Sequence, residues 1–316
     1  MKWVLLAVGI IIVVLIALTE IAFKASIIKK KKKKPETEER YINREKVREK
    51  NNAFLFSHNP QDVSIINPDG LTLRGWYVPA EKPTNKFVIF SHGYGCNGPD
   101  EFSHMFPFYH SELEFNCLYP DHRAHGRSDG KYIGFGALDY KDILLWIGYL
   151  IGRFGENIEI VLHGISMGAA TVMLVNEANP PEQVKFIIED CGYTNAREEV
   201  SNTLKDLIGF RFELLVMLTS LMCKIRAGYF LNDADCIGKM SQAKKPVLFI
   251  HGGSDTFVPT EMGLRLYEAC TVPKDLLIVK GAVHAFSYYD DKEAYEAKIK
   301  DFVGKYIKEY TSTALK

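Results

Sequence analysis

Gly164-Ile165-Ser166-Met167-Gly168 lies between a short apolar run, residues 159–163, and a run that favours a helix, residues 169–175. A serine pinched between small residues at a strand-to-helix turn is held in a strained and exposed position. The flanking glycines are needed because side chains there would collide with the neighbouring strand and helix. The bare Gly-x-Ser-x-Gly pattern is weak evidence, since glycine and serine are common. With a strand before it and a helix after it, the pattern predicts that Ser166 is a nucleophile rather than an ordinary turn residue.

Around this turn, apolar runs of strand length alternate with stretches of helical spacing. The expected strands are residues 63–66, 71–78, 86–90, 116–119, 159–163, 185–188, 246–250 and 275–279. The expected helices include residues 139–154, 259–270 and 294–310. This alternation predicts an α/β protein whose mostly parallel central sheet is covered by helices on both faces. In such sheets the chemistry gathers beyond the carboxyl ends of the strands.

Three of those carboxyl ends carry groups that could act together. Ser166 follows one strand, Asp255 follows the next-to-last in His251-Gly-Gly-Ser-Asp255, and His284 follows the last. A serine hydroxyl is a poor nucleophile unless a base removes its proton, and an imidazole, which titrates near neutral pH, suits that role. We therefore expect His284 to be the base and Asp255 to hold its ring. Asp190, after the sixth strand, is the alternative acid.

The landmarks stand in the order serine, acid, histidine, as in α/β-hydrolases. Besides the serine motif they comprise Ser91-His-Gly-Tyr-Gly95, the turn at residues 121–130, and His251 to Asp255 with Val258-Pro259, followed by His284. Over about residues 56–310 the chain resembles the α/β-hydrolase superfamily, in particular membrane-anchored bacterial serine hydrolases of the serine aminopeptidase-like and cinnamoyl-esterase-like branches. Ala124 departs from the pattern, because many members have glycine in that turn.

A tetrahedral intermediate needs prearranged donors for its oxyanion. The backbone N–H of Met167 is well placed for this in a turn of the Ser166 kind. The resemblance places the second N–H on Tyr94. The tyrosine hydroxyl either assists or belongs to a ring that only walls the pocket.

The first 28 residues form a predicted membrane anchor. Residues 3–23 are apolar apart from Thr19 and Glu20, and as a helix they would reach about 31 Å, enough to cross a hydrocarbon core. A secretory signal peptide is the alternative, but no clear small-x-small cleavage site follows. Lys24 and the run Lys29 to Lys34 favour a cytoplasmic body by the positive-inside rule, with an extracellular body left open.

The predicted organisation is therefore an anchor (1–28), a charged juxtamembrane linker (29–55) that could be helical, and a hydrolase domain (56–316). Within the domain, residues 191–245 are more than one sheet-crossing helix needs and hold many large apolar side chains. These residues form either a small helical cap with an apolar lid or a core helix against the sheet.

Composition limits the possible partners. Beyond residue 50 the chain has 26 Lys+Arg and 33 Asp+Glu, a net charge of −7, which argues against nucleic acid. The six cysteines show no disulfide or zinc-ligand spacing, and no metal or organic cofactor is indicated. We expect a membrane-tethered serine hydrolase that cleaves a carboxylic ester of a small or lipid-like substrate through an acyl-enzyme. A serine peptidase acting on short peptides, a thioesterase, or a catalytically silent binding protein of the same fold are the alternatives.

Overall fold

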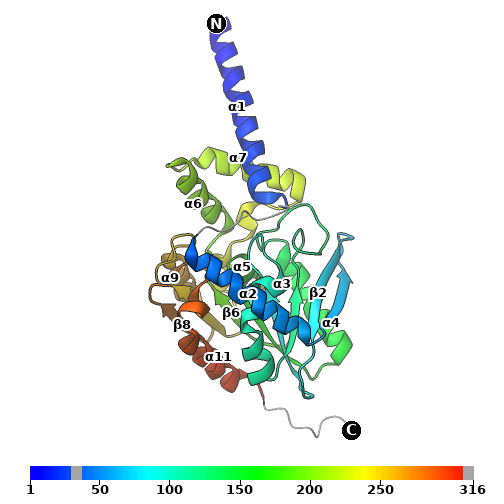
Figure 1. Ribbon diagram of the computed structural model, residues 1–316. Coiled ribbons are helices and arrows are strands. Elements are labelled where there is room, and N and C mark those ends of the chain that lie inside the picture. Colours follow the sequence, from blue (N-terminus) through cyan, green and yellow to red (C-terminus); the bar gives the residue numbers. More distant parts are fainter. Residues whose placement is uncertain (30–37, 309–316) are drawn as a thin grey trace.

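The computed structural model describes residues 1–29 and 38–308, built around one eight-stranded sheet (Figure 1). The strands are β1 (Gln61–Ile66), β2 (Thr72–Val78), β3 (Lys86–Ser91), β4 (Asn116–Pro120), β5 (Glu159–Ile165), β6 (Val184–Asp190), β7 (Val247–Gly252) and β8 (Lys274–Val279). Their spatial order is β1-β2-β4-β3-β5-β6-β7-β8. The strands from β4 to β8 pair in parallel, and β1 and β2 form an antiparallel edge. The predicted mostly parallel sheet is confirmed.

The hairpin at this edge follows from its turn sequence. The side-chain oxygen of Asn67 accepts hydrogen bonds from the backbone N–H groups of Asp69 (3.1 Å) and Leu71 (3.0 Å). Gly70 takes a φ of +77°, which glycine adopts at little cost. The turn therefore fixes the register in which Ile66 pairs with Thr72.

Helices cover both faces of the sheet, as predicted. The α-helices are α1 (Lys2–Ile27), α2 (Glu39–Ser57), α3 (Gly98–Phe102), α4 (Asp139–Phe154), α5 (Met167–Glu177), α6 (Ala196–Ile208), α7 (Glu213–Ala227), α8 (Cys236–Met240), α9 (Thr260–Ala269), α10 (Ser287–Asp290) and α11 (Lys292–Tyr306). Shorter elements are the 3-10 helices η1 (Ser103–Met105) and η3 (Leu231–Asp233) and the π-helix η2 (Pro107–Glu112). One apolar cluster packs α4, α5 and α9 on the sheet, and a second packs α3 and α11 on the other face.

The inserted segment after β6 forms the predicted small cap. Helix α7 lies beside the end of α1 (Figure 1) and α6 packs on α7, rather than in either layer that covers the sheet. One side of α7 is buried through residues such as Val216 and Cys223, whereas Met217, Leu221 and Ile225 on its other side are exposed. The buried face of α7 packs mainly on α1, α6 and η3 rather than on the sheet, which favours the interpretation as an apolar cap over that as a core helix.

Helix α1 is long and apolar enough to cross a membrane. Its buried side chains, Thr19, Ala22, Phe23 and Ile27, all lie in its last turns. Its end continues onto the body, where the backbone N–H of Ile133 donates to the carbonyl oxygen of Ile27 at 2.8 Å.

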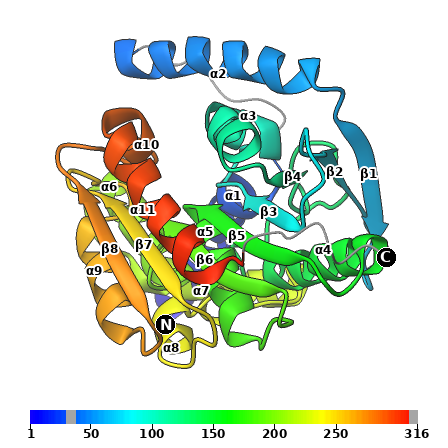
Figure 2. The same cartoon turned by 90° about the horizontal axis from the view of Figure 1, so that it is seen from below.

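The charged range 29–55 contains most of α2, which crosses the α3 side of the body (Figure 2). Leu55 is fully buried, the Asn52 side chain donates to Asp100 at 2.7 Å, and Arg40 pairs with Asp290. A charged sequence thus packs on the domain through a few contacts at each end. Lys30 to Lys34, and the expected end of the last helix at residue 310, lie outside the described residues.

Candidate active site

Ser166 stands at the point where β5 ends and α5 begins. Its φ of +57° and ψ of −117° are a conformation that a side-chain-bearing residue adopts only when its surroundings enforce it. Both flanking glycines are required by contact, because a Cβ on Gly164 would overlap the backbone of Gly168 and a Cβ on Gly168 would overlap the carbonyl of Ser91. The strained turn that the sequence predicts is therefore present.

The structure brings Ser166, His284 and Asp255 together. The Nε2 atom of His284 lies 2.9 Å from the Oγ atom of Ser166, and its Nδ1 atom lies 2.7 Å from an oxygen of Asp255. A carboxylate only accepts hydrogen bonds, so Nδ1 carries the proton and Nε2 is left to accept from the serine hydroxyl. This tautomer is the one in which an imidazole can take a proton from Ser166.

Asp255 is held as a carboxylate by its neighbours. Burial opposes ionisation, but hydrogen bonds from His251 and His284 outweigh it and lower the pKa of Asp255 to about 2. Its second oxygen accepts from the backbone N–H groups of Phe257 and Val258, both at 3.0 Å. A negative charge therefore faces the imidazole of His284 at neutral pH.

His251 also faces Asp255 and helps to keep it ionised, a role that the sequence did not reveal. Its Nε2 atom lies 3.5 Å from Asp255 and 2.9 Å from the carbonyl oxygen of Val258. The spacing of four residues between His251 and Asp255 was the available signal, but a histidine at a strand end has many other uses.

Asp190, the alternative acid, is directed elsewhere. It accepts hydrogen bonds from the hydroxyl groups of Tyr295 (2.9 Å) and Ser287 (3.4 Å). Burial raises the pKa of Asp190 to about 6. Of the two candidate acids, only Asp255 is hydrogen-bonded to His284 in the described structure.

The loop after β3 lies against Ser166. A Cβ atom placed on Gly93 would be 3.5 Å from the Cβ atom of Ser166. The hydroxyl of the next residue, Tyr94, donates to the carbonyl oxygens of Ser26 (2.9 Å) and Ala25 (3.3 Å) in α1. Its ring packs on Phe135. Because these contacts occupy the hydroxyl group, they favour the interpretation in which the Tyr94 ring forms a wall and its hydroxyl does not assist the reaction.

Cys191, Asp255 and His284 also lie close enough to hold a metal ion. Both ring nitrogens of His284 are already hydrogen-bonded, to Asp255 and to Ser166. The arrangement therefore suits proton transfer from Ser166.

Ala124 takes a φ of +58° in the turn after β4. The shape for which glycine is favoured is therefore kept with alanine, and the residue is buried.

Solved structures share this architecture. The esterase Pf2001 of Pyrococcus furiosus superimposes with a TM-score of 0.65 at 22% identity, covering 80% of this chain and 93% of the esterase. With its strand order and the sharp turn at Ser166, the chain has the α/β-hydrolase fold.

The prolyl oligopeptidase family matches residues 134–310. The uncharacterized protein YqkD of Bacillus subtilis is 30% identical over 305 residues, which cover 96% of this chain and 97% of YqkD. The lysophosphatidylserine lipase ABHD12 of Danio rerio is 26% identical over 211 residues, 64% of this chain and 51% of the lipase. The chain belongs to the prolyl oligopeptidase family and is a serine hydrolase.

Proposed function

We propose that this chain is a membrane-anchored hydrolase that cleaves the carboxylic ester of a lipid-like substrate through an acyl-enzyme on Ser166. The single observation that carries the proposal is the hydrogen-bonded series Ser166–His284–Asp255, with distances of 2.9 and 2.7 Å. The esterase and lipase names of the similar proteins support an ester as the substrate.

In the proposed reaction the Oγ atom of Ser166 attacks the ester carbonyl carbon while Nε2 of His284 takes the hydroxyl proton. The oxyanion that forms accepts hydrogen bonds from the backbone N–H groups of Met167 and Tyr94. His284 then gives the proton to the departing alcohol, which leaves an acyl group on Ser166. Water, deprotonated by the same imidazole, releases the acid and restores the serine.

The geometry of α1 supports membrane anchoring. The first buried side chain of α1 is Thr19, so 17 residues, Lys2 to Leu18, precede the buried part of the helix. At 1.5 Å per residue they reach about 25 Å, short of a hydrocarbon core of about 30 Å. In the proposed arrangement the exposed apolar face of α7 therefore lies in the same leaflet as the end of the anchor.

A groove between α1 and α7 supports a lipid-like substrate. It has a volume of about 400 Å³ and is lined by Ile12, Leu15, Ile16, Thr19, Leu218, Leu221, Met222, Ile225 and Arg226. Arg226 pairs with Glu20 of α1 at 2.7 Å. Because one wall of the groove is the proposed membrane span, acyl chains of the bilayer have direct access to it.

Two measurements test the function. Rapid mixing with a p-nitrophenyl ester should give a burst of about one p-nitrophenol per chain, because acylation precedes hydrolysis of the acyl-enzyme. Turnover of peptide amides without ester turnover would favour the peptidase reading instead. No turnover of either would favour the silent binding protein.

The lipid part of the proposal has its own test. Replacing Met217, Leu221 and Ile225 with glutamine should lower kcat/KM for a long-chain ester in vesicles at least about tenfold and leave a soluble acetate ester unchanged. Ile66→Gln, on β1 at a site as exposed as Ile225, is the control. Equal losses on both substrates would contradict a membrane-facing role for α7.

The cytoplasmic orientation rests on the lysine-rich flank and stays a prediction. Protease treatment of intact cells checks it, because a cytoplasmic body is protected and an extracellular body is digested.

A further inference from the structure

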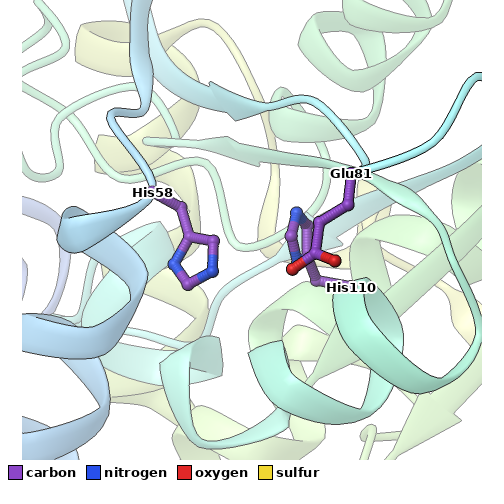
Figure 3. Close-up of side chains that lie close together, drawn as sticks. All are labelled: His58, Glu81 and His110. Carbon is purple, nitrogen blue, oxygen red and sulfur yellow. The ribbon is translucent and has the colours of Figure 1, made fainter.

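Three side chains that can bind a metal meet far from Ser166 in the fold. His58 caps the end of α2, Glu81 lies between β2 and β3, and His110 lies in the π-helix η2 (Figure 3). One ligand atom from each lies within 4.8 Å of the other two.

The cluster and the active site lie at opposite ends of the strands of the sheet. The end of β2, Val78, pairs with Cys117 at the start of β4. Glu81 follows shortly after, near the amino ends of the parallel strands. Ser166 and His284 instead follow carboxyl ends.

Hydrogen bonds fix the tautomers of both imidazoles. Nε2 of His110 lies 2.9 Å from the carbonyl oxygen of Pro79, and Nδ1 of His58 lies 2.9 Å from that of Phe54. Carbonyl oxygens only accept, so these nitrogens carry the protons and the other nitrogen of each ring has a free lone pair. Metal-binding histidines are oriented in this way, by donating the second N–H to a carbonyl or carboxylate.

The lone pair on Nδ1 of His110 accepts no hydrogen bond from the described residues. The residue is 2% exposed, and its Nδ1 atom is buried without a hydrogen-bond partner among the described residues. A buried acceptor without a partner costs free energy unless something binds it.

The rings are also held in place by packing. The ring of His110 stacks on Phe106 with centroids 4.5 Å apart, and the ring of His58 meets the edges of Phe54 and Phe106. Figure 3 shows the His58 ring turned toward Glu81 and His110.

We propose that His58, Glu81 and His110 bind one divalent transition-metal ion of the zinc class. Two imidazoles and one carboxylate are an established zinc ligand set, with water in the fourth position. Zinc at about 2.1 Å from tetrahedral ligands sets those ligands about 3.4 Å apart. The three atoms therefore have to close by little more than an ångström, which the exposed Glu81 and the half-buried His58 can accommodate.

The ion joins α2 to the hydrolase body. At the opposite end of α2, Tyr41 and Arg44 contact the ring of Phe286, two residues after His284. Binding at His58 thus stabilises the position of a helix that covers the segment carrying the proposed base. The site itself takes no part in the hydrolytic step.

Zinc titration of the full chain in detergent micelles, after removal of metals with a chelator, tests the proposal. Calorimetry should give one zinc per chain, and Tm should rise by about 5 °C when free zinc is 100 times Kd. Glu81→Gln and His110→Gln should each weaken zinc binding at least about tenfold. Since Glu81 is exposed, its variant also serves if the buried His110→Gln fails to fold.

Two controls separate this site from others. Glu112→Gln changes a different exposed glutamate, which lies in η2 near His110, and should leave zinc binding unchanged. His284→Ala removes the cluster at the active site and should also keep the zinc. Absence of saturable binding, or loss of the zinc in His284→Ala with retention in Glu81→Gln, would overturn the proposal while leaving the proposed hydrolase function untouched.

Discussion

The hydroxyl group of Tyr94 donates a hydrogen bond of 2.9 Å to the backbone carbonyl oxygen of Ser26, in the last turn of α1. The apolar N-terminal helix is thereby connected to the loop that lies against Ser166. Burial raises the pKa of Tyr94 to about 12, so its hydroxyl remains a donor throughout the physiological range. The proposed anchor is therefore attached to the loop beside the active site rather than being a separate tether.

Replacing Tyr94 with phenylalanine separates the hydrogen bond of its hydroxyl group to α1 from the proposed hydrogen bond of its backbone N–H to the oxyanion. The backbone N–H remains, so we expect kcat for a soluble ester to fall less than about tenfold, while the lost hydrogen bond lowers the free energy of unfolding by about 1 kcal/mol. His284→Ala should lower kcat by orders of magnitude. Steady-state kinetics of both variants provide the check, and equal losses would make the Tyr94 hydroxyl a catalytic group.

The two candidate acids give opposite predictions. Asp255→Asn removes the carboxylate that holds the proton on Nδ1 of His284, and we expect kcat to fall by about 10⁴. Asp190→Asn alters a hydrogen bond to Tyr295 and should leave kcat within about tenfold of the wild type. Ester hydrolysis by both purified variants tests this ranking. The reverse ranking would reassign the acid.

Glu189 predicts a pH dependence of stability. Burial raises its pKa to about 8 from an ordinary value of 4.5, so between these pH values the folded chain binds more protons than the unfolded chain. Stability contributed by the protonated form is complete below pH 4.5 and is lost as pH rises toward 8. Glu189→Gln should therefore flatten the fall in stability over this window.

Urea unfolding of wild type and Glu189→Gln at several pH values measures the effect. We expect the variant to be the more stable chain at pH 9, because it has no buried carboxyl group to ionise. Parallel pH profiles would show that Glu189 does not titrate as described.

Two helical glycines, Gly168 in α5 and Gly148 in α4, give opposite predictions for the effect of alanine on stability. Gly168→Ala places a methyl group on the carbonyl of Ser91, which cannot move without displacing β3, and we expect destabilisation by more than about 3 kcal/mol. Gly148, inside α4, has open space around its Cβ position. Gly148→Ala should stabilise the chain by about 0.5–1 kcal/mol. Chemical denaturation measures both, and a tolerated Gly168→Ala would contradict the packing at the serine turn.

Local patterns were sufficient for much of the fold. The expected helix at residues 139–154 matches α4 residue for residue, and the apolar runs became strands with small shifts at their ends. Ser166, Asp255 and His284 could be found because each follows a strand, and parallel strands bring their carboxyl ends to one edge. The prediction of a strained turn at Ser166 needed only the glycines on either side.

Contacts between distant segments were not predictable in the same way. The packing of α2 depends on the burial of Leu55 and on the hydrogen bond from Asn52 to Asp100. The charged residues around both positions gave no sign of these contacts in the sequence. The contact of His58 with Glu81 and His110 depends on the end of α2, a loop and a π-helix together, and the three residues show no ligand spacing in the chain. The contact of His251 with Asp255 depends on how the loop after β7 folds back.

The central claim is that one hydroxyl group, that of Ser166, is the nucleophile activated by His284. Labelling of the full-length chain with a fluorophosphonate probe tests it most directly, with Ser166→Ala as the comparison and a peptide map to locate the adduct. We predict one adduct per chain on Ser166, none in Ser166→Ala, and strongly slowed labelling in His284→Ala. Equal labelling of wild type and Ser166→Ala would contradict the account.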